Sequence, residues 1–180
     1  MRILVTGATG LIGSAVVARL IRAGHAVTGL SRSVTSARRH QPEADWLSVD
    51  IARHVTAERG VPHLQGIEAV VNCAGALQDG PADSLQGVHT VGIGALFVAC
   101  EQLGIRRVVH FSAIGVDRAA PTGFSRTKLA GDQGLMARNL DWVILRPSVV
   151  LGRTAYGASA LMRALAALPV LPLMPNTGTS

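Results

Sequence analysis

Short runs of apolar residues recur along the chain, separated by longer segments in which apolar residues are spaced as on one face of a helix. The runs are nearly continuous, as expected for strands that are buried on both faces of a sheet. We therefore predict six strands: Arg2–Thr6, Ala26–Leu30, Trp46–Val49, Ala69–Asn72, Arg107–Phe111 and Trp142–Leu145.

Three segments between these strands have clear helical periodicity, and two of them stop at a glycine. The intervals at residues 34–44 and 52–65 have helix length but weak periodicity, so their boundaries are not assigned. Strands that alternate with helices predict the α/β class, with a doubly wound parallel sheet (Rossmann fold) in three layers, α/β/α. The predicted helices are Ile12–Ala23, Val88–Leu103 and Gly123–Arg138.

Composition limits the class of protein further. The chain has 180 residues, of which 48% are hydrophobic and 16% are charged, which excludes a disordered chain and predicts one domain over residues 1–180. Its two cysteines, Cys73 and Cys100, lie in apolar stretches, which excludes a disulfide framework or a zinc site built on cysteine pairs, and no metal is expected. The first residues do not resemble a signal peptide, and Leu161–Met174 is shorter than the roughly 20 residues that span a bilayer. We expect a cytoplasmic protein without a membrane partner.

The net charge is +6, and 16 of the 17 basic residues are arginine, which suits forked contacts with phosphate. The arginines are scattered, however, and aromatic residues do not alternate with them as a base-stacking surface requires. We therefore expect no nucleic-acid partner. Most arginines then belong to a solvated surface, and a few remain for a small phosphate ligand.

A glycine-rich segment follows the first predicted strand and opens the first helix. Residues 6–13 read Thr-Gly-Ala-Thr-Gly-Leu-Ile-Gly, a G-x-x-G-x-x-G pattern. Its glycines allow a tight turn and close approach of backbone N–H groups to a pyrophosphate, and the helix N-terminus favours the negative charge. The cofactor-binding residues predicted here are Gly7, Thr9, Gly10, Leu11 and Ile12.

The end of the second strand bears on which dinucleotide is bound. An NAD site would offer an acidic side chain to the ribose 2′-hydroxyl, but this chain has Arg32 between two serines. An arginine suits the 2′-phosphate of NADP, and a charged hydrogen bond of about 1.5 to 3 kcal/mol corresponds to a roughly ten- to hundredfold preference. We predict NADP as the cofactor. NAD is the less favoured alternative, and it stays open because arginine is also an ordinary surface residue.

Several segments resemble those of the extended or atypical short-chain dehydrogenase/reductases. This group includes NAD(P)-dependent epimerases and dehydratases and the NADPH-binding accessory subunit of respiratory complex I. The resemblance covers nearly the whole chain. Besides the glycine motif, the segments that carry it are Asn72-Cys73-Ala74-Gly75, Val109–Gly115, Phe124–Lys128 and Leu145–Gly152.

The resemblance implies further contacts with the cofactor. Asp50 and Ile51 would hold the adenine ring, although an aspartate in this place serves equally well as a helix N-cap. The small residues after the fourth strand would leave room for a ribose, and the segment after the sixth strand would lie beside the nicotinamide. The residues implied are Asp50, Ile51, Cys73, Ala74, Gly75, Lys128, Pro147 and Val149.

The catalytic set that the resemblance implies is incomplete. Ser112 and Lys128 match the family's catalytic serine and lysine, but the position of the proton-transferring tyrosine is Phe124. General acid/base catalysis contributes about 10²- to 10⁴-fold in rate, so ordinary carbonyl reduction should be crippled. Three residues are candidates to replace the tyrosine: Ser125 would point about 100° away around the helix, His110 fits a core histidine better, and Tyr156 begins the final loop. Ser112 is equally a residue that could satisfy a local backbone group.

The sequence leaves three functions open. The first is an NADP(H)-binding oxidoreductase or epimerase-like enzyme that lacks the usual tyrosine and acts on an unknown small molecule. The second is a non-catalytic NADP(H)-binding scaffold, redox-sensing or assembly subunit. The third is a binder of nucleic acid or an acidic partner that only retains the fold. Because extended members of the family are longer, we also expect a fragment whose substrate segment is largely missing, and whose exposed apolar surface favours a homodimer.

Overall fold

The computed structural model describes residues 1–54, 64–81, 83–118, 121–152 and 164–167. The chain divides into two units, Met1–Val150 and Leu151–Ser180, and every strand and helix discussed below belongs to the first. Tyr156, and Leu161–Met174 apart from residues 164–167, lie outside the described residues.

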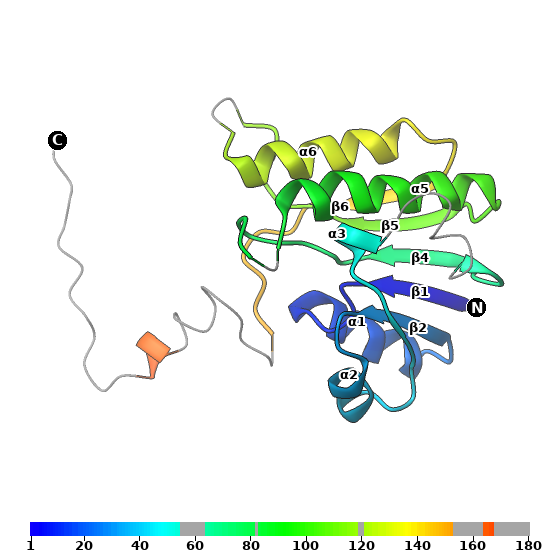
Figure 1. The fold of residues 1–180 in the computed structure, drawn as a ribbon. Helices are drawn as coiled ribbons and strands as arrows, with labels where there is room; N and C mark the ends of the chain where they lie inside the picture. Colours follow the sequence, from blue (N-terminus) through cyan, green and yellow to red (C-terminus); the bar gives the residue numbers. More distant parts are fainter. Residues whose placement is uncertain (55–63, 82, 119–120, 153–163, 168–180) are drawn as a thin grey trace, which may run out of the picture. The chain divides into compact units, whose positions relative to one another are not determined.

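Six parallel strands form one sheet in the order β3-β2-β1-β4-β5-β6 (Figure 1). The chain builds outward from β1 through β2 to β3, and then returns to place β4 on the other side of β1. A ligand in such a sheet binds outside the carboxyl ends of the strands, where this order reverses. The strands are β1 (Arg2–Thr6), β2 (Ala26–Ser31), β3 (Asp45–Ser48), β4 (Ala69–Asn72), β5 (Arg107–Phe111) and β6 (Asp141–Leu145).

Helices cover both faces of the sheet, so the predicted doubly wound α/β/α fold is confirmed. In Figure 1, α1 and α2 lie on one side of the strands, and α5 and α6 lie on the other. The helices are α1 (Leu11–Arg22), α2 (Val34–His40), α3 (Ile51–His54), η2 (Gly87–Gly92, a π-helix), α5 (Ile93–Gln102) and α6 (Gly123–Met136).

Residues of β1 alternate between two hydrophobic cores, one on each face of the sheet. Val5 packs in the cluster that contains Val17 of α1, whereas Leu4 packs in the cluster that contains Phe97 of α5. All four side chains are fully buried. Burial on both faces explains why Ile3–Val5 is a continuous apolar run between Arg2 and Thr6.

The predicted helix over Val88–Leu103 differs in its first turns, which form the π-helix η2. A Cβ added at Gly92 would lie 2.0 Å from the carbonyl oxygen of Ile51, so η2 packs directly on the backbone of α3. This close approach joins segments that are distant in sequence, and local periodicity does not report it. The π-helical turns of η2 therefore could not be predicted from the sequence.

Strand β6 is an edge of the described sheet and is poorly covered. Trp142, Val143 and Leu145 are 36 to 49% exposed, in contrast to the buried strands at the centre. Among the helices in the described ranges, none has the length and apolar content needed to cross a membrane. Within the same ranges, no cluster of His, Cys, Asp and Glu is arranged to hold a metal ion.

Candidate functional site

A pocket lies at the carboxyl ends of β1, β2, β3 and β4, where the strand order reverses. These strand ends and the loops after them come from separate parts of the sequence, and the parallel sheet brings them to one edge. Nine of the residues predicted to bind a cofactor line this pocket: Gly7, Thr9, Gly10, Arg32, Asp50, Ile51, Cys73, Ala74 and Gly75.

The glycine loop forms one wall of the pocket and depends on close backbone packing. Gly7 has φ +59°, and a Cβ there would lie 2.6 Å from the carbonyl oxygen of Cys73. A Cβ at Gly13 would lie 2.1 Å from the carbonyl oxygen of Gly7, so α1 packs directly against the loop. Gly10 begins α1 in an extended conformation without a side-chain cap. The positive end of the α1 dipole is thus presented at the pocket, as anion binding requires.

Five predicted cofactor residues do not line the pocket: Lys128, described below, and four others. Leu11 and Ile12 are half-buried in the first turn of α1. Pro147 is half-buried, and its carbonyl oxygen accepts a hydrogen bond from Ile114 N at 3.0 Å. Val149 is 72% exposed. Contacts from these residues to a cofactor stay predictions.

Arg32, the predicted phosphate-binding residue, faces a carboxylate at the pocket. Its Nη1 lies 2.9 Å from Asp83 Oδ1, and the two side chains are 57% and 45% exposed. Asp83 also lines the pocket, and the sequence patterns did not single it out. The local charge around Arg32 is therefore less positive than the sequence alone implied.

Asp50 caps a helix and also lines the pocket. Its Oδ1 accepts a hydrogen bond from Ala52 N at 3.0 Å, which confirms the N-cap of α3. Its Oδ2 lies 3.8 Å from Arg53 Nε, and the residue also lines the pocket. The contact with adenine stays a prediction.

Lys128 lies beneath the inner wall of the pocket. It is 5% exposed, and its Nζ donates hydrogen bonds to Phe111 O at 2.9 Å and Ala74 O at 3.5 Å. A Cβ added at Gly75 would be 3.4 Å from this nitrogen. Burial lowers the pKa of Lys128 to about 8, and burial raises the pKa of the neighbouring Cys73 thiol to about 12. The cysteine is therefore protonated and unreactive.

Ser112 does not satisfy a local backbone group, and its catalytic role stays a prediction. Its hydroxyl is 6% exposed and donates a hydrogen bond to Asp132 Oδ2 at 2.9 Å, so its partner is a side chain and not the local backbone. Asp132 was not identified from the sequence. Because its O–H group is engaged in this hydrogen bond, the hydroxyl can only accept a hydrogen bond from another group.

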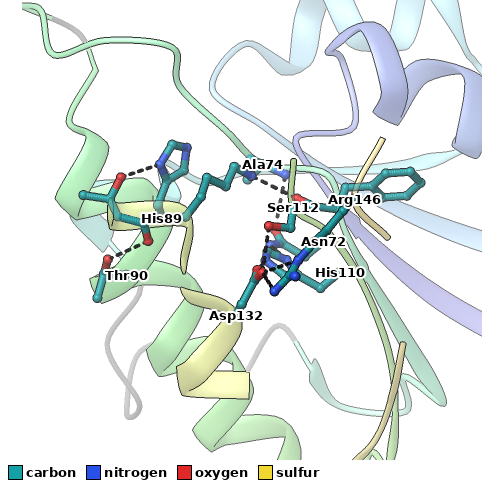
Figure 2. A network of polar contacts seen from close by, with 11 residues as sticks. Asn72, Ala74, His89, Thr90, His110, Ser112, Asp132 and Arg146 are labelled. Carbon is teal, nitrogen blue, oxygen red and sulfur yellow. Dashed lines mark hydrogen bonds and ion pairs between the residues drawn. The ribbon is translucent and has the colours of Figure 1, made fainter. Parts of the chain in front are cut away.

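Asp132 is the centre of a buried polar network, shown in Figure 2. Its Oδ2 also accepts hydrogen bonds from Arg146 Nε at 3.1 Å and Nη2 at 3.0 Å. His110 Nε2 lies 3.2 Å from Oδ1, a contact at ion-pair distance that does not have hydrogen-bond geometry. One carboxylate thus joins the ends of β5 and β6 to α6.

The network continues through Asn72 to β1. Asn72 Oδ1 accepts hydrogen bonds from Ala74 N, at 3.2 Å, and from the Thr6 hydroxyl, which fixes the orientation of the amide. Its Nδ2 must then donate to His110 Nδ1, at 2.7 Å, so the ring carries its proton on Nε2. His110 is fully buried and belongs to this network, as the core interpretation expected.

Charges in the network follow from burial and hydrogen bonding. Burial opposes ionisation of Asp132, but the close contact with His110 and the hydrogen bonds from Ser112 and Arg146 outweigh it and hold its pKa below the ordinary value. Burial lowers the pKa of His110, and the Asp132 contact opposes this only in part. The network therefore holds a carboxylate that Arg146 balances, next to a neutral imidazole. One sequence signal was available: Asp132 lies four residues after Lys128, on the same helix face.

Phe124, at the position of the expected tyrosine, packs against a buried histidine. Its ring and that of His89 are 5.4 Å apart at 86°, an edge-to-face contact. His89 Nε2 accepts a hydrogen bond from Ala76 N at 3.0 Å, so Nδ1 must donate to Thr127 Oγ1 at 2.9 Å. Burial, with the positive charge of Lys128, lowers the pKa of His89 to about 3.

We expect the protein to lose stability in mild acid because of His89. Its folded-state pKa lies below the unfolded value of about 6.5, so its contribution is complete above that pH and declines as pH falls below it. At pH 5 the loss relative to neutral pH should be about 2 kcal/mol from this residue. Urea unfolding at both pH values measures it. The difference should shrink in His89→Gln and persist in the exposed His40→Gln, whereas equal stability of the parent at both pH values would contradict the assignment.

A family model described as NAD(P)H-binding matches residues 7–164. An uncharacterized protein of Mycobacterium tuberculosis (strain ATCC 25618 / H37Rv) is 30% identical over 177 residues, covering 96% of this chain and 17% of the relative. A 2-alkyl-3-oxoalkanoate reductase of Stenotrophomonas maltophilia is 31% identical over 176 residues, covering 84% of this chain and 52% of the relative. The chain thus spans a sixth to about half of the length of these relatives.

Solved structures share the fold at lower identity. A putative NAD-dependent epimerase/dehydratase from Bacillus halodurans has a TM-score of 0.73 at 22% identity, over 87% of this chain and 74% of the neighbour. The Bordetella bronchiseptica enzyme WbmH in complex with NAD+ has a TM-score of 0.73 at 23% identity, over 92% of this chain and 62% of the neighbour.

Proposed function

The chain belongs to the NAD(P)H-binding family, and from this premise we propose that residues 1–180 are the NADP(H)-binding part of a short-chain dehydrogenase/reductase-like oxidoreductase or epimerase-like protein. The observation that carries the proposal is the pocket at the switch point, which nine residues chosen from sequence patterns line together. In this proposal, the N-terminus of α1 and the loop at Gly7–Gly10 receive the pyrophosphate.

The other assignments extend along the same pocket. Arg32 would contact a 2′-phosphate, and the apolar face of Ile51 would contact the adenine ring. Lys128, against Gly75, would donate to the nicotinamide ribose, and its lowered pKa means that burial already disfavours its charge. When bound, the nicotinamide supplies or accepts a hydride. The substrate would be a small molecule with a carbonyl or hydroxyl carbon, as the name of the Stenotrophomonas maltophilia reductase suggests.

The second candidate is a non-catalytic NADP(H)-binding scaffold or redox-sensing subunit. Two observations favour it over a conventional reductase. Phe124 has no proton to transfer, and Ser112 donates its proton to Asp132. Neither group can protonate a developing alkoxide in this arrangement, so catalysis would need a proton from water, from the substrate or from another residue.

Titration of the purified chain with NADPH and with NADH, followed by nicotinamide fluorescence, tests the proposal. NADPH should bind at least about tenfold more tightly than NADH if Arg32 contacts the phosphate. Gly10→Val should weaken both by about tenfold or more, because its side chain would enter the pyrophosphate wall. Gly134→Val is the matched control, since a Cβ there meets nothing within 4 Å. Unchanged NADPH affinity in Gly10→Val would overturn the cofactor site.

A further inference from the structure

The segment after β4 is tied to the adenosine end of the pocket by two arginines. Arg32 Nη1 lies 2.9 Å from Asp83 Oδ1, and Arg53 Nη2 donates a hydrogen bond to Pro81 O at 3.2 Å. Arg32 follows β2 and Arg53 lies on α3, so two different parts of the rim contact this segment. These two contacts therefore hold Asp83 at the pocket.

Local hydrogen bonds fix the position of the Asp83 backbone. Gly80 N donates to Asp83 O at 2.9 Å, and Asp83 N donates to Gly80 O at 3.3 Å. Asp79 Oδ1 accepts from Leu85 N at 2.8 Å on the far side of the turn. These contacts keep the carboxylate facing Arg32.

Asp83 competes with a phosphate ligand for the guanidinium of Arg32. A carboxylate can only accept hydrogen bonds, and it occupies one edge of the guanidinium that a phosphate would use. The pair is exposed, so it is weak enough for a phosphate dianion to displace the carboxylate. The displaced carboxylate nevertheless remains at the same wall and repels the phosphate.

We propose that Asp83 is a specificity-determining residue of the pocket, which opposes Arg32 and reduces the preference for a nucleotide with a 2′-phosphate over one with a 2′-hydroxyl. This inference rests on the proposed dinucleotide site. Arg32 alone predicts a strong preference for NADP, whereas the Arg32–Asp83 pair predicts a moderate one that the charge at residue 83 controls.

Calorimetric titration with 2′,5′-ADP and with 5′-AMP tests this without any reaction. Asp83→Asn should strengthen binding of 2′,5′-ADP by about three- to tenfold and leave 5′-AMP within about twofold. Arg32→Ala should weaken binding of 2′,5′-ADP, and adding Asp83→Asn to it should then strengthen binding less than in the parent, because the competition for Arg32 is gone and only the repulsion of the phosphate is relieved. Asp45→Asn, an exposed change on β3 outside the pocket, should change neither affinity.

The outcomes distinguish a failure of the role proposed for Asp83 from a failure of the proposed nucleotide site. If Asp83→Asn leaves 2′,5′-ADP affinity unchanged, or alters both nucleotides equally, the role of Asp83 is overturned while the nucleotide site stands. If the folded parent binds neither nucleotide, the proposed function fails, and the inference fails with it. Both side chains are largely exposed, so the variants should fold, and thermal unfolding checks this.

Discussion

Replacing Phe124 with tyrosine should raise the rate of hydride transfer from NADPH to a carbonyl compound by about 10²- to 10⁴-fold, the range that a positioned general acid contributes. Phe124 lies one turn before Lys128 on α6, and both approach His89 beside Gly75. A phenol introduced there would have the proton that Phe124 does not have. Stopped-flow oxidation of NADPH with a panel of aldehydes and ketones measures the change.

A second readout needs no substrate. The introduced phenol should ionise below its ordinary pKa of about 10, because a nearby ammonium group favours the phenolate. The ultraviolet difference spectrum between Phe124→Tyr and the parent follows this ionisation. Adding Lys128→Met should return the pKa towards its ordinary value and remove the gain in rate.

Ser125→Tyr is the matched control, since it places the same phenol about 100° around the helix. It should give neither the lowered pKa nor the activity. A parent that already reduces carbonyls as fast as Phe124→Tyr would show that another proton source serves the site, and would favour the enzyme over the scaffold.

Replacing Asp132 with alanine should destabilise the fold by about 3 kcal/mol, at the lower end of what breaking a buried ion pair costs. The change removes the acceptor of Ser112 and of two Arg146 donors, and it leaves His110 facing a cavity. The loss is limited because Arg146 is 36% exposed and retains a contact with Asp117 at 3.2 Å. Urea unfolding at neutral pH measures the difference.

Two comparisons make this result interpretable. Asp132→Asn keeps an acceptor and similar volume, so it should lose less stability than the alanine variant. Asp141→Ala breaks the exposed pair with Arg107 and should cost less than about 1 kcal/mol. If Asp132→Ala unfolds at the same urea concentration as Asp141→Ala, the network contributes no more than a surface pair.

Much of the fold follows from features that are local in sequence. The bounds of β1, β4 and β5 could be predicted because each strand is an apolar run buried in a parallel sheet. The glycine loop, Arg32 and Asp50 could be placed together because each follows a strand whose carboxyl end meets the same edge.

Contacts between distant segments could not be predicted. The pairing of Asp132 with Ser112 and Arg146 depends on how α6 lies across the ends of β5 and β6, and no spacing in one segment encodes that. Asp83 reaches Arg32 only through the turn that starts at Gly80. The sequence shows that Phe124 departs from a motif, but its packing against His89 depends on the position of η2.

The order of the strands also determines when this site can exist during synthesis of the chain. The pocket needs β1 beside β4, and that pairing joins Ile3 to Ala69 across the whole of β2 and β3. A nascent chain in which β4 has not yet been synthesised has the glycine loop but lacks the pocket wall formed by the residues after β4. A nucleotide that binds only the completed pocket would stabilise the folded chain without helping its first strands to form, so it should slow unfolding more than it speeds folding.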